Sequence, residues 1–184
     1  QGGRGALPRE ARAPLHRPLS SDLGRTPVTD RIEAWLRAEG VPFRLLEHAP
    51  VRTSEEAARV RGTPPEAGAK ALVVLAENRP VHCVLPGNLR ADNARLRGIL
   101  GVRTLRFATP TELLELTGCV PGAVPPFGNL FGLPVLVDEL LLEREEIAFN
   151  AGSNTVSILM RAADFARLSG ARACRFAQAV SPGG

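Results

Sequence analysis

The sequence predicts one domain of the α/β class, in which about seven short strands alternate with four to five helices. Its 184 residues are 44% hydrophobic and 23% charged, a composition typical of a globular protein with one buried core. Helix-start signals and short apolar runs follow one another along the chain, without an internal repeat or a second-domain boundary. No stretch of about 18 apolar residues occurs, which argues against a membrane-spanning helix. Seven Phe, one Trp and no Tyr provide little aromatic surface for stacking bases, so an RNA-binding face built from an aromatic platform is not expected.

Both ends of the chain are predicted to lie outside the domain, which we place at residues 28–172. Residues 1–27 carry five arginines against Glu10 and Asp22, and thus +3 of the formal charge of +4. Their glycines and prolines predict a disordered basic leader, and an organellar transit peptide would share this composition. Residues 173–184 are predicted to form a C-terminal tail. Because the rest of the chain is close to neutral, net charge alone does not indicate a nucleic-acid-binding protein.

Capping signals and apolar runs predict the elements in the first half of the domain. A polar N-cap followed three residues later by Glu marks a helix start. This signal predicts a helix capped by Asp30 and another capped by Thr53, with a short strand at 42–46 between them. The apolar runs 70–76 and 81–85 are separated by a polar segment and predict a β-hairpin.

The same signals continue in the second half. Asp92 is predicted to cap one further helix, and Thr109, followed by Pro110 and Glu112, is predicted to cap another, with a strand near 102–107 between them. Residues 118–132 contain four glycines and three prolines and are predicted to form a long irregular loop. The last predicted elements are strands at 134–137, 146–149 and 156–160 and a helix at 161–168.

Several common catalytic chemistries have no matching motif in this chain. It has no phosphate-binding glycine loop, no GxSxG serine motif and no metal-binding histidine pattern. The three cysteines, Cys83, Cys119 and Cys174, are too few and too far apart for a disulfide framework or a metal site, which fits a reducing, cytoplasmic setting. Cys119 has two interpretations, a nucleophile or a buried thiol. We therefore expect no metal ion and no organic cofactor.

Three segments stand out as candidates for a functional site. Of the 23 basic residues only Lys70 is a lysine, which has two interpretations: a position where a compact ammonium group is required, or the chance survival of one lysine. The loop 118–132 has glycines that let a ligand approach the backbone and prolines that stiffen it, although a plain surface connection is the alternative. Residues 150–153 form a break of small and polar residues between two predicted strands.

These segments carry a resemblance to a known family. The stretches GAKALVVLA (68–76), LTGCVPGAVPPFG (116–128) and EEIAFNAGS (145–153), in this order, resemble the YbaK-like aminoacyl-tRNA deacylase superfamily. That superfamily includes the editing domain inserted in bacterial prolyl-tRNA synthetases. The resemblance implies a mixed, barrel-like β-sheet surrounded by helices. It also implies hydrolysis of the ester that links a wrong amino acid to the terminal adenosine of a tRNA.

The resemblance further implies which residues form the site. The lysine of the family matches Lys70, which is expected to hold a phosphate or ribose of the tRNA. N–H groups at Gly122 and Ala123 are expected to stabilise the oxyanion, while a ribose hydroxyl of the substrate activates water. Lys70, Gly122 and Ala123 are thus the expected catalytic residues. The residues expected to bind the substrate are Val124, Pro125, Pro126, Phe127, Asn150, Ala151, Gly152 and Ser157.

The function expected from these observations is that of a freestanding enzyme that edits mischarged tRNA in trans. Its expected partners are the 3′ acceptor end of aminoacyl-tRNA and an aminoacyl-tRNA synthetase, with no membrane and no metal. The side chains of Ser153, Asn154 and Ser157 favour a small polar amino acid such as Ser or Thr as the one removed. Two alternatives stay open: a non-catalytic module that binds tRNA or a synthetase, and a nucleotide-binding protein that uses the same cleft.

Overall fold

A long β-hairpin forms the centre of the fold. The computed structural model describes residues 24–181, and in it β2 (Ala69–Ala76) pairs antiparallel with β3 (Arg79–Pro86) along their whole length. Glu77 and Asn78 connect the two strands with φ angles of 49° and 67°. Two successive positive φ angles are the mark of the tight hairpin turn whose twist matches that of the strands. The predicted hairpin is therefore confirmed.

Three more strands extend the hairpin into a mixed sheet in the order β5-β2-β3-β6-β9. On one side β5 (Leu105–Phe107) runs antiparallel to β2. On the other side β6 (Val135–Asp138) runs parallel to β3, and β9 (Arg172–Cys174) runs parallel to β6. The mixed character of the sheet agrees with the prediction.

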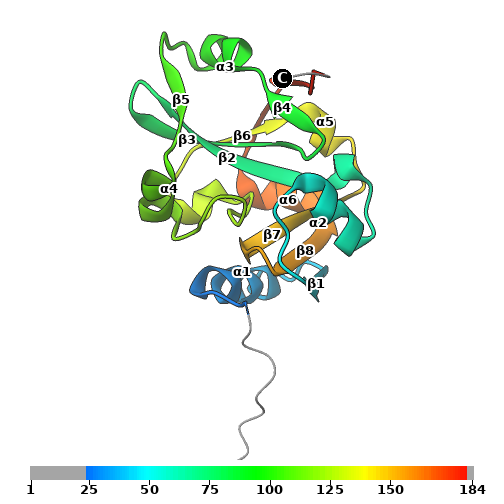
Figure 1. Ribbon diagram of the computed structural model, residues 1–184. Helices are drawn as coiled ribbons and strands as arrows, with labels where there is room; N and C mark the ends of the chain where they lie inside the picture. The colour runs from blue at the N-terminus through cyan, green and yellow to red at the C-terminus, as the bar shows by residue number, and fades with distance from the viewer. Residues whose placement is uncertain (1–23, 182–184) are drawn as a thin grey trace, which may run out of the picture.

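A second sheet packs beside the first. It consists of β1 (Phe43–Glu47), β8 (Val156–Arg161) and β7 (Glu146–Ser153), all antiparallel, and a bridge between Gly68 and Ala148 links β7 to the start of β2. A short pair, β4 (Leu89–Ala91) with β10 (Ala177–Ala179), forms a third sheet. Figure 1 shows β7 and β8 beside α1 at one end of the molecule and β4, β5 and α3 at the other, with the central hairpin between them.

Six α-helices in the described residues complete the α/β fold. They are α1 (Pro27–Ala38), α2 (Ser54–Arg61), α3 (Asn93–Leu100), α4 (Pro110–Thr117), α5 (Glu139–Leu142) and α6 (Ala162–Ser169). The predicted caps at Thr53, Asp92 and Thr109 are confirmed, since each side chain accepts a hydrogen bond from the first turn of its helix. Two 3-10 turns, at Pro65–Ala67 and Gly128–Phe131, interrupt the loops.

The start of α1 differs from the prediction. Thr26, and not Asp30, is the N-cap, because its side chain accepts the Thr29 N–H and Pro27 occupies the first helical position. The acidic residues that suggested a cap have another role, since Arg25 pairs with Asp30 at 2.6 Å and with Glu33 at 2.5 Å. The Thr26 hydroxyl also donates to the Gly152 carbonyl, so the segment just before α1 is tied to β7.

Edge-on aromatic contacts around Phe127 organise the larger part of the core. The ring of Phe127 meets those of Trp35, Phe165 and Phe149 at centroid distances of 5.1, 5.4 and 5.6 Å. Such pairs contribute about 1 kcal/mol each beyond the burial of their area. Phe127 is fully buried, so its side chain anchors the loop 118–132 in the core and is not available to bind substrate, contrary to the expectation.

The remaining differences from the predicted elements are local. Residues 24–181 form ten strands and six α-helices, more than the sequence predicts. The additional elements are β4, α5, β9 and β10, which are only three or four residues long and carry no strong sequence pattern. The expected break at 150–153 is part of β7, with a register shift between Asn150 and Ser153. Part of the expected C-terminal tail forms β10. Residues 1–23, most of the expected leader, lie outside the described part of the chain.

Among the described helices, none has the length and the apolar character needed to cross a membrane.

Candidate functional site

A cleft of about 330 Å³ opens beside the first residues of β2. Its walls come from the start of α2, from the beginning of β2, from the loop 118–132 and from β7 with its following turn. The residues that line it include Thr53, Arg61, Lys70, Gly122, Asn150 and Asn154. Segments far apart in the sequence thus meet at one polar cavity, and all three segments singled out in the sequence contribute to it.

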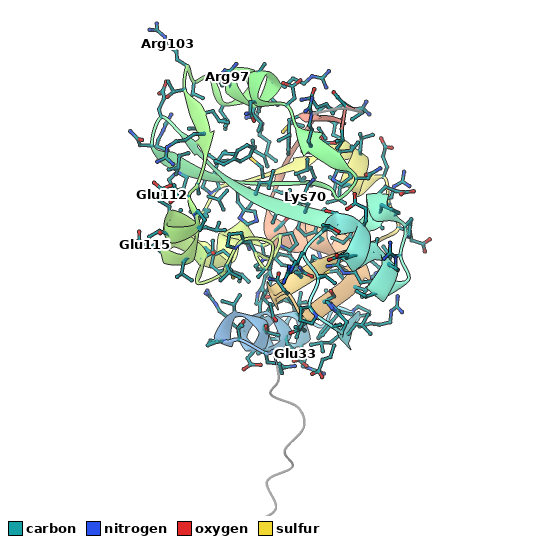
Figure 2. The ribbon with its side chains drawn as sticks, viewed as in Figure 1. Glu33, Lys70, Arg97, Arg103, Glu112 and Glu115 are labelled. Carbon is teal, nitrogen blue, oxygen red and sulfur yellow. The ribbon has the colours of Figure 1, made fainter. Side chains whose placement is uncertain are left out.

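Lys70 places a positive charge at this cleft. Its side chain is half-buried, and Nζ donates to the backbone carbonyls of Leu89 and of Gly87, the latter at 3.4 Å. Burial lowers the pKa of Lys70 from its ordinary value, while the negative charge of Glu55 opposes that shift. Figure 2 shows Lys70 on β2 near the middle of the molecule. Because its partners are neutral carbonyls, the ammonium keeps an uncompensated charge for an anionic ligand.

The loop 118–132 presents Gly122 to the cleft. Gly122 has a φ of +82°, a backbone conformation that glycine adopts without strain. Its carbonyl accepts a hydrogen bond of 2.8 Å from Asn150 Nδ2. In the described part of the chain no acceptor is found for its N–H, which leaves this donor available to a ligand.

Ala123 differs from the expectation. Its N–H donates to the Val120 carbonyl at 3.1 Å, and its own carbonyl accepts from the Gly152 N–H at 2.9 Å. Only 1% of the residue is exposed. Because the Ala123 N–H already donates to a carbonyl within the loop, it does not donate to an oxyanion in this arrangement. Ala123 instead helps to position Gly122.

Arg61, at the end of α2, is a cleft residue that the sequence did not reveal. Its guanidinium donates to Asn150 Oδ1 at 2.6 Å, to Ser157 Oγ at 2.8 Å and to the Ala148 carbonyl at 3.4 Å. Burial lowers the pKa of Arg61 to about 10, which leaves it a cation at neutral pH. Because Arg only donates hydrogen bonds, it fixes the Asn150 oxygen toward itself and turns the Asn150 amino group toward Gly122.

Ser157 belongs to this network and not to the cleft wall. It is fully buried, and its hydroxyl contacts Arg61 Nε, Asn150 Oδ1 at 3.3 Å and His48 Nε2 at 2.7 Å. A side chain so enclosed orients Arg61 and Asn150 but does not reach a ligand. The expectation that Ser157 binds substrate directly is therefore not met by the geometry.

The other expected substrate-binding residues are likewise either in the cleft wall or buried away from it. Val124 lines the cleft, whereas Pro125 and Pro126 of the same loop are buried and do not line it. Ala151 is also buried, and its carbonyl accepts from Thr29 Oγ1 at 2.6 Å. A Cβ on Gly152 would lie 2.8 Å from Val28, so this glycine permits close packing of β7 against α1.

The interpretation of Cys119 as a buried thiol fits the structure. It is 2% exposed, lies in a small apolar cluster and does not line the cleft. Burial raises the pKa of its thiol, which disfavours the nucleophilic thiolate. In residues 24–181 no three His, Cys, Asp or Glu side chains gather in a way that could hold a metal ion.

Comparisons with known proteins agree with the resemblance read from the sequence. The model of the aminoacyl-tRNA editing domain family matches residues 48–168, which include every wall of the cleft. The multifunctional Ser/Thr-tRNA deacylase ProXp-y of Escherichia coli strain K12 is 38% identical over 155 residues, covering 81% of this chain and 93% of that protein. A proline–tRNA ligase of Thermotoga neapolitana is 35% identical over 91 residues, which are 50% of this chain but 16% of the ligase.

Solved structures show the same fold. A crystal structure described as a candidate trans-editing enzyme for prolyl-tRNA synthetase superposes with a TM-score of 0.76 at 29% identity, covering 84% of this chain and 99% of that one. The hypothetical protein APE2540 superposes with a TM-score of 0.74 at 28% identity, covering 80% and 99%. With the family model, the sequence relative and the fold in agreement, this chain belongs to the aminoacyl-tRNA editing domain family.

Proposed function

We propose that this protein hydrolyses the ester bond of mischarged aminoacyl-tRNA, with the aminoacyl end of the tRNA bound in the cleft. The observation that carries the proposal is the juxtaposition of the Lys70 ammonium with the Gly122 backbone across one cavity. An anionic nucleotide needs the first group, and the developing oxyanion of ester hydrolysis needs the second. Membership of the editing domain family supports the same reaction.

The charge of the cleft suits the end of a tRNA. Arg52, Arg61 and Lys70 line it, and the N-terminus of α2 at Ser54 faces it with the positive end of its dipole. These groups attract the phosphate next to the terminal adenosine. Since Lys70 is held by two backbone carbonyls, its ammonium is positioned before the substrate arrives.

The chemical step needs few protein groups. A water oxygen attacks the ester carbonyl carbon, and the Gly122 N–H stabilises the negative charge that forms on the carbonyl oxygen. The bond between that carbon and the ribose oxygen then breaks, the ribose oxygen takes a proton, and the free amino acid leaves. A ribose hydroxyl of the substrate activates the water, since among residues 24–181 no histidine, cysteine, aspartate or glutamate lines the cleft.

A small polar amino acid fits the walls of the cleft. Thr53, Ser54 and Asn154 line it, and the Asn154 Oδ1 is buried without a hydrogen-bond partner among the described residues. The hydroxyl of Ser or Thr would supply that partner, whereas the methyl group of Ala would not. The Escherichia coli relative carries the name of a Ser/Thr-tRNA deacylase, which supports this choice. The synthetase that misacylates the tRNA is the expected second partner.

A deacylation time course tests the proposal. We would charge tRNAs with Ser, Thr, Ala, Cys and Pro and follow the loss of each ester in the presence of the purified protein. Rapid hydrolysis of the Ser or Thr ester, with slower loss of the others, is the expected result. Hydrolysis of none of the five at a rate above that in buffer would contradict the proposed activity.

A further inference from the structure

A second pocket lies directly beside the cleft. It has a volume of about 550 Å³ and shares two wall residues, Lys70 and Leu72, with the cleft. Its other walls come from β4, the start of α3, the end of β5 and β10, and are formed by Arg90, Ala91, Asp92, Asn93, Ala94, Phe107 and Gln178. Figure 1 shows β4, α3 and β5 at the end of the molecule opposite α1. The two cavities are therefore neighbours on either side of Lys70 and Leu72.

We propose that this pocket binds the cytidine that precedes the terminal adenosine of a tRNA, with its base stacked on Phe107. This inference rests on the proposed function, because it places the next nucleotide of the same substrate. If the terminal aminoacyl-adenosine fills the cleft, the phosphodiester that joins it to the cytidine lies where the two cavities meet. Lys70 is the charged residue common to both.

Phe107 is the residue that identifies the ligand as a base. It is 47% exposed, and the other large hydrophobic side chains exposed among residues 24–181, Val60, Leu114, Val120 and Val180, are aliphatic. The same pocket is lined by Lys70 and Arg90 as well as by Asp92. An exposed aromatic ring near cationic side chains is the usual platform for an unpaired nucleotide, because every base offers a π face to stack. The ring sits at the end of β5, in the edge strand of the central sheet.

Polar side chains around the ring match a nucleotide. Arg90 on β4 lies opposite Gln178 on β10 in the strand register, and its guanidinium donates to Ser181 Oγ at 3.2 Å, a neutral partner that leaves its charge free for a phosphate. Gln178 offers both a donor and an acceptor to the edge of a base. The Asn93 Oδ1 is buried and lacks a hydrogen-bond partner within the described chain, and the amino group of cytosine is a suitable donor to it.

The affinity for short nucleotides tests this proposal independently of the proposed activity, because binding is measured without hydrolysis of an ester. The dinucleotide CpA and adenosine 5′-monophosphate share the adenosine and its phosphate, and differ by the cytidine. We expect the wild-type protein to bind CpA about tenfold more tightly in calorimetric titrations, which is the usual contribution of one stacked base. In Phe107→Ala this ratio is expected to fall close to one, and in Phe107→Trp it is expected to persist.

The matched control is Leu114→Ala, which removes a side chain that is 51% exposed on α4 and lines neither cavity. Its CpA preference is expected to equal that of the wild type. Equal affinity of the wild type for the two ligands, or an unchanged ratio in Phe107→Ala, would overturn the proposal. Hydrolysis is measured separately, so a protein that prefers CpA through Phe107 but leaves every aminoacyl ester intact would contradict the proposed activity and still support the pocket.

Discussion

Asn150 Nδ2 donates a hydrogen bond of 2.8 Å to the Gly122 carbonyl and so ties β7 to the glycine-rich loop. The same side chain accepts from Arg61 at 2.6 Å. One amide therefore joins α2, β7 and the loop that carries the available N–H of Gly122. A neutral side chain that neither donates a proton nor attacks the ester can control activity in this way, by fixing a backbone donor.

Replacing Asn150 tests this connection. We expect Asn150→Ala to lower kcat/KM for deacylation about fivefold, because one hydrogen bond worth about 1 kcal/mol no longer fixes the Gly122 peptide. The control is Asn129→Ala, since Asn129 Nδ2 makes a similar bond of 3.0 Å to the Leu168 carbonyl away from the cleft. Steady-state kinetics and thermal melts of both variants provide the measurement. Equal kcat/KM values for the two variants would argue against the role of Asn150.

The conformation of Gly122 provides the second prediction. Gly122→Ala places a side chain at a φ of +82°, which costs about 1 to 2 kcal/mol and shifts the peptide away from its position in the cleft. Gly132→Ala is the matched control, because Gly132 has a φ of +70°, ends the same loop and has open space around a new Cβ. Both variants are expected to lose similar stability in urea titrations. Only Gly122→Ala is expected to lose most of its deacylation activity, and similar activity losses in both would contradict the assignment.

We expect His82 to make the free energy of unfolding depend on pH. It lies beneath the loop, where a Cβ on Gly128 would meet its side chain at 2.5 Å, and complete burial lowers its pKa from 6.5 to about 4. Between these values the unfolded chain binds the proton more strongly, so the free energy of unfolding falls as the pH falls. The loss from pH 7 to 4.5 is expected to be about 2 kcal/mol.

Urea titrations at pH 7 and at pH 4.5 check this expectation in the wild type and in His82→Leu. The variant lacks the titrating ring, so its stability should change less over this interval. An equally large change in the variant would show that other groups carry the pH dependence.

The sequence predicts most of the elements because their signals are local. The capping boxes at Thr53 and Thr109 and the hairpin turn at Asn78 involve residues within one or two turns of each other. The strands β9 and β10 are not predicted from the sequence, because each is three residues long and is stabilised by pairing with a distant strand. At α1 two cap signals compete, and Pro27 at the first helical position favours Thr26.

The site is predicted only in part, for a related reason. Lys70 is recognisable because it is the sole lysine, whereas Arg61 is one arginine among many and acquires its role through contacts with residues 89 and 96 positions away. The glycines of the loop indicate where a backbone can approach a ligand. The structure is needed to show which backbone N–H groups can donate to a ligand. The Ala123 N–H cannot, because it donates to the Val120 carbonyl within a turn, and no spacing in the sequence predicts that turn.

The measurement that tests the central claim most directly compares the deacylation rates of the wild type and of Lys70→Met on tRNA mischarged with Ser or with Thr. Methionine keeps most of the side-chain stem but removes the ammonium group that the cleft positions. We expect kcat/KM to fall about 100-fold, the usual loss when a hydrogen bond to a charged group is removed, with a melting temperature close to that of the wild type. Hydrolysis by a folded Lys70→Met protein at the wild-type rate would contradict the claim that Lys70 holds the substrate.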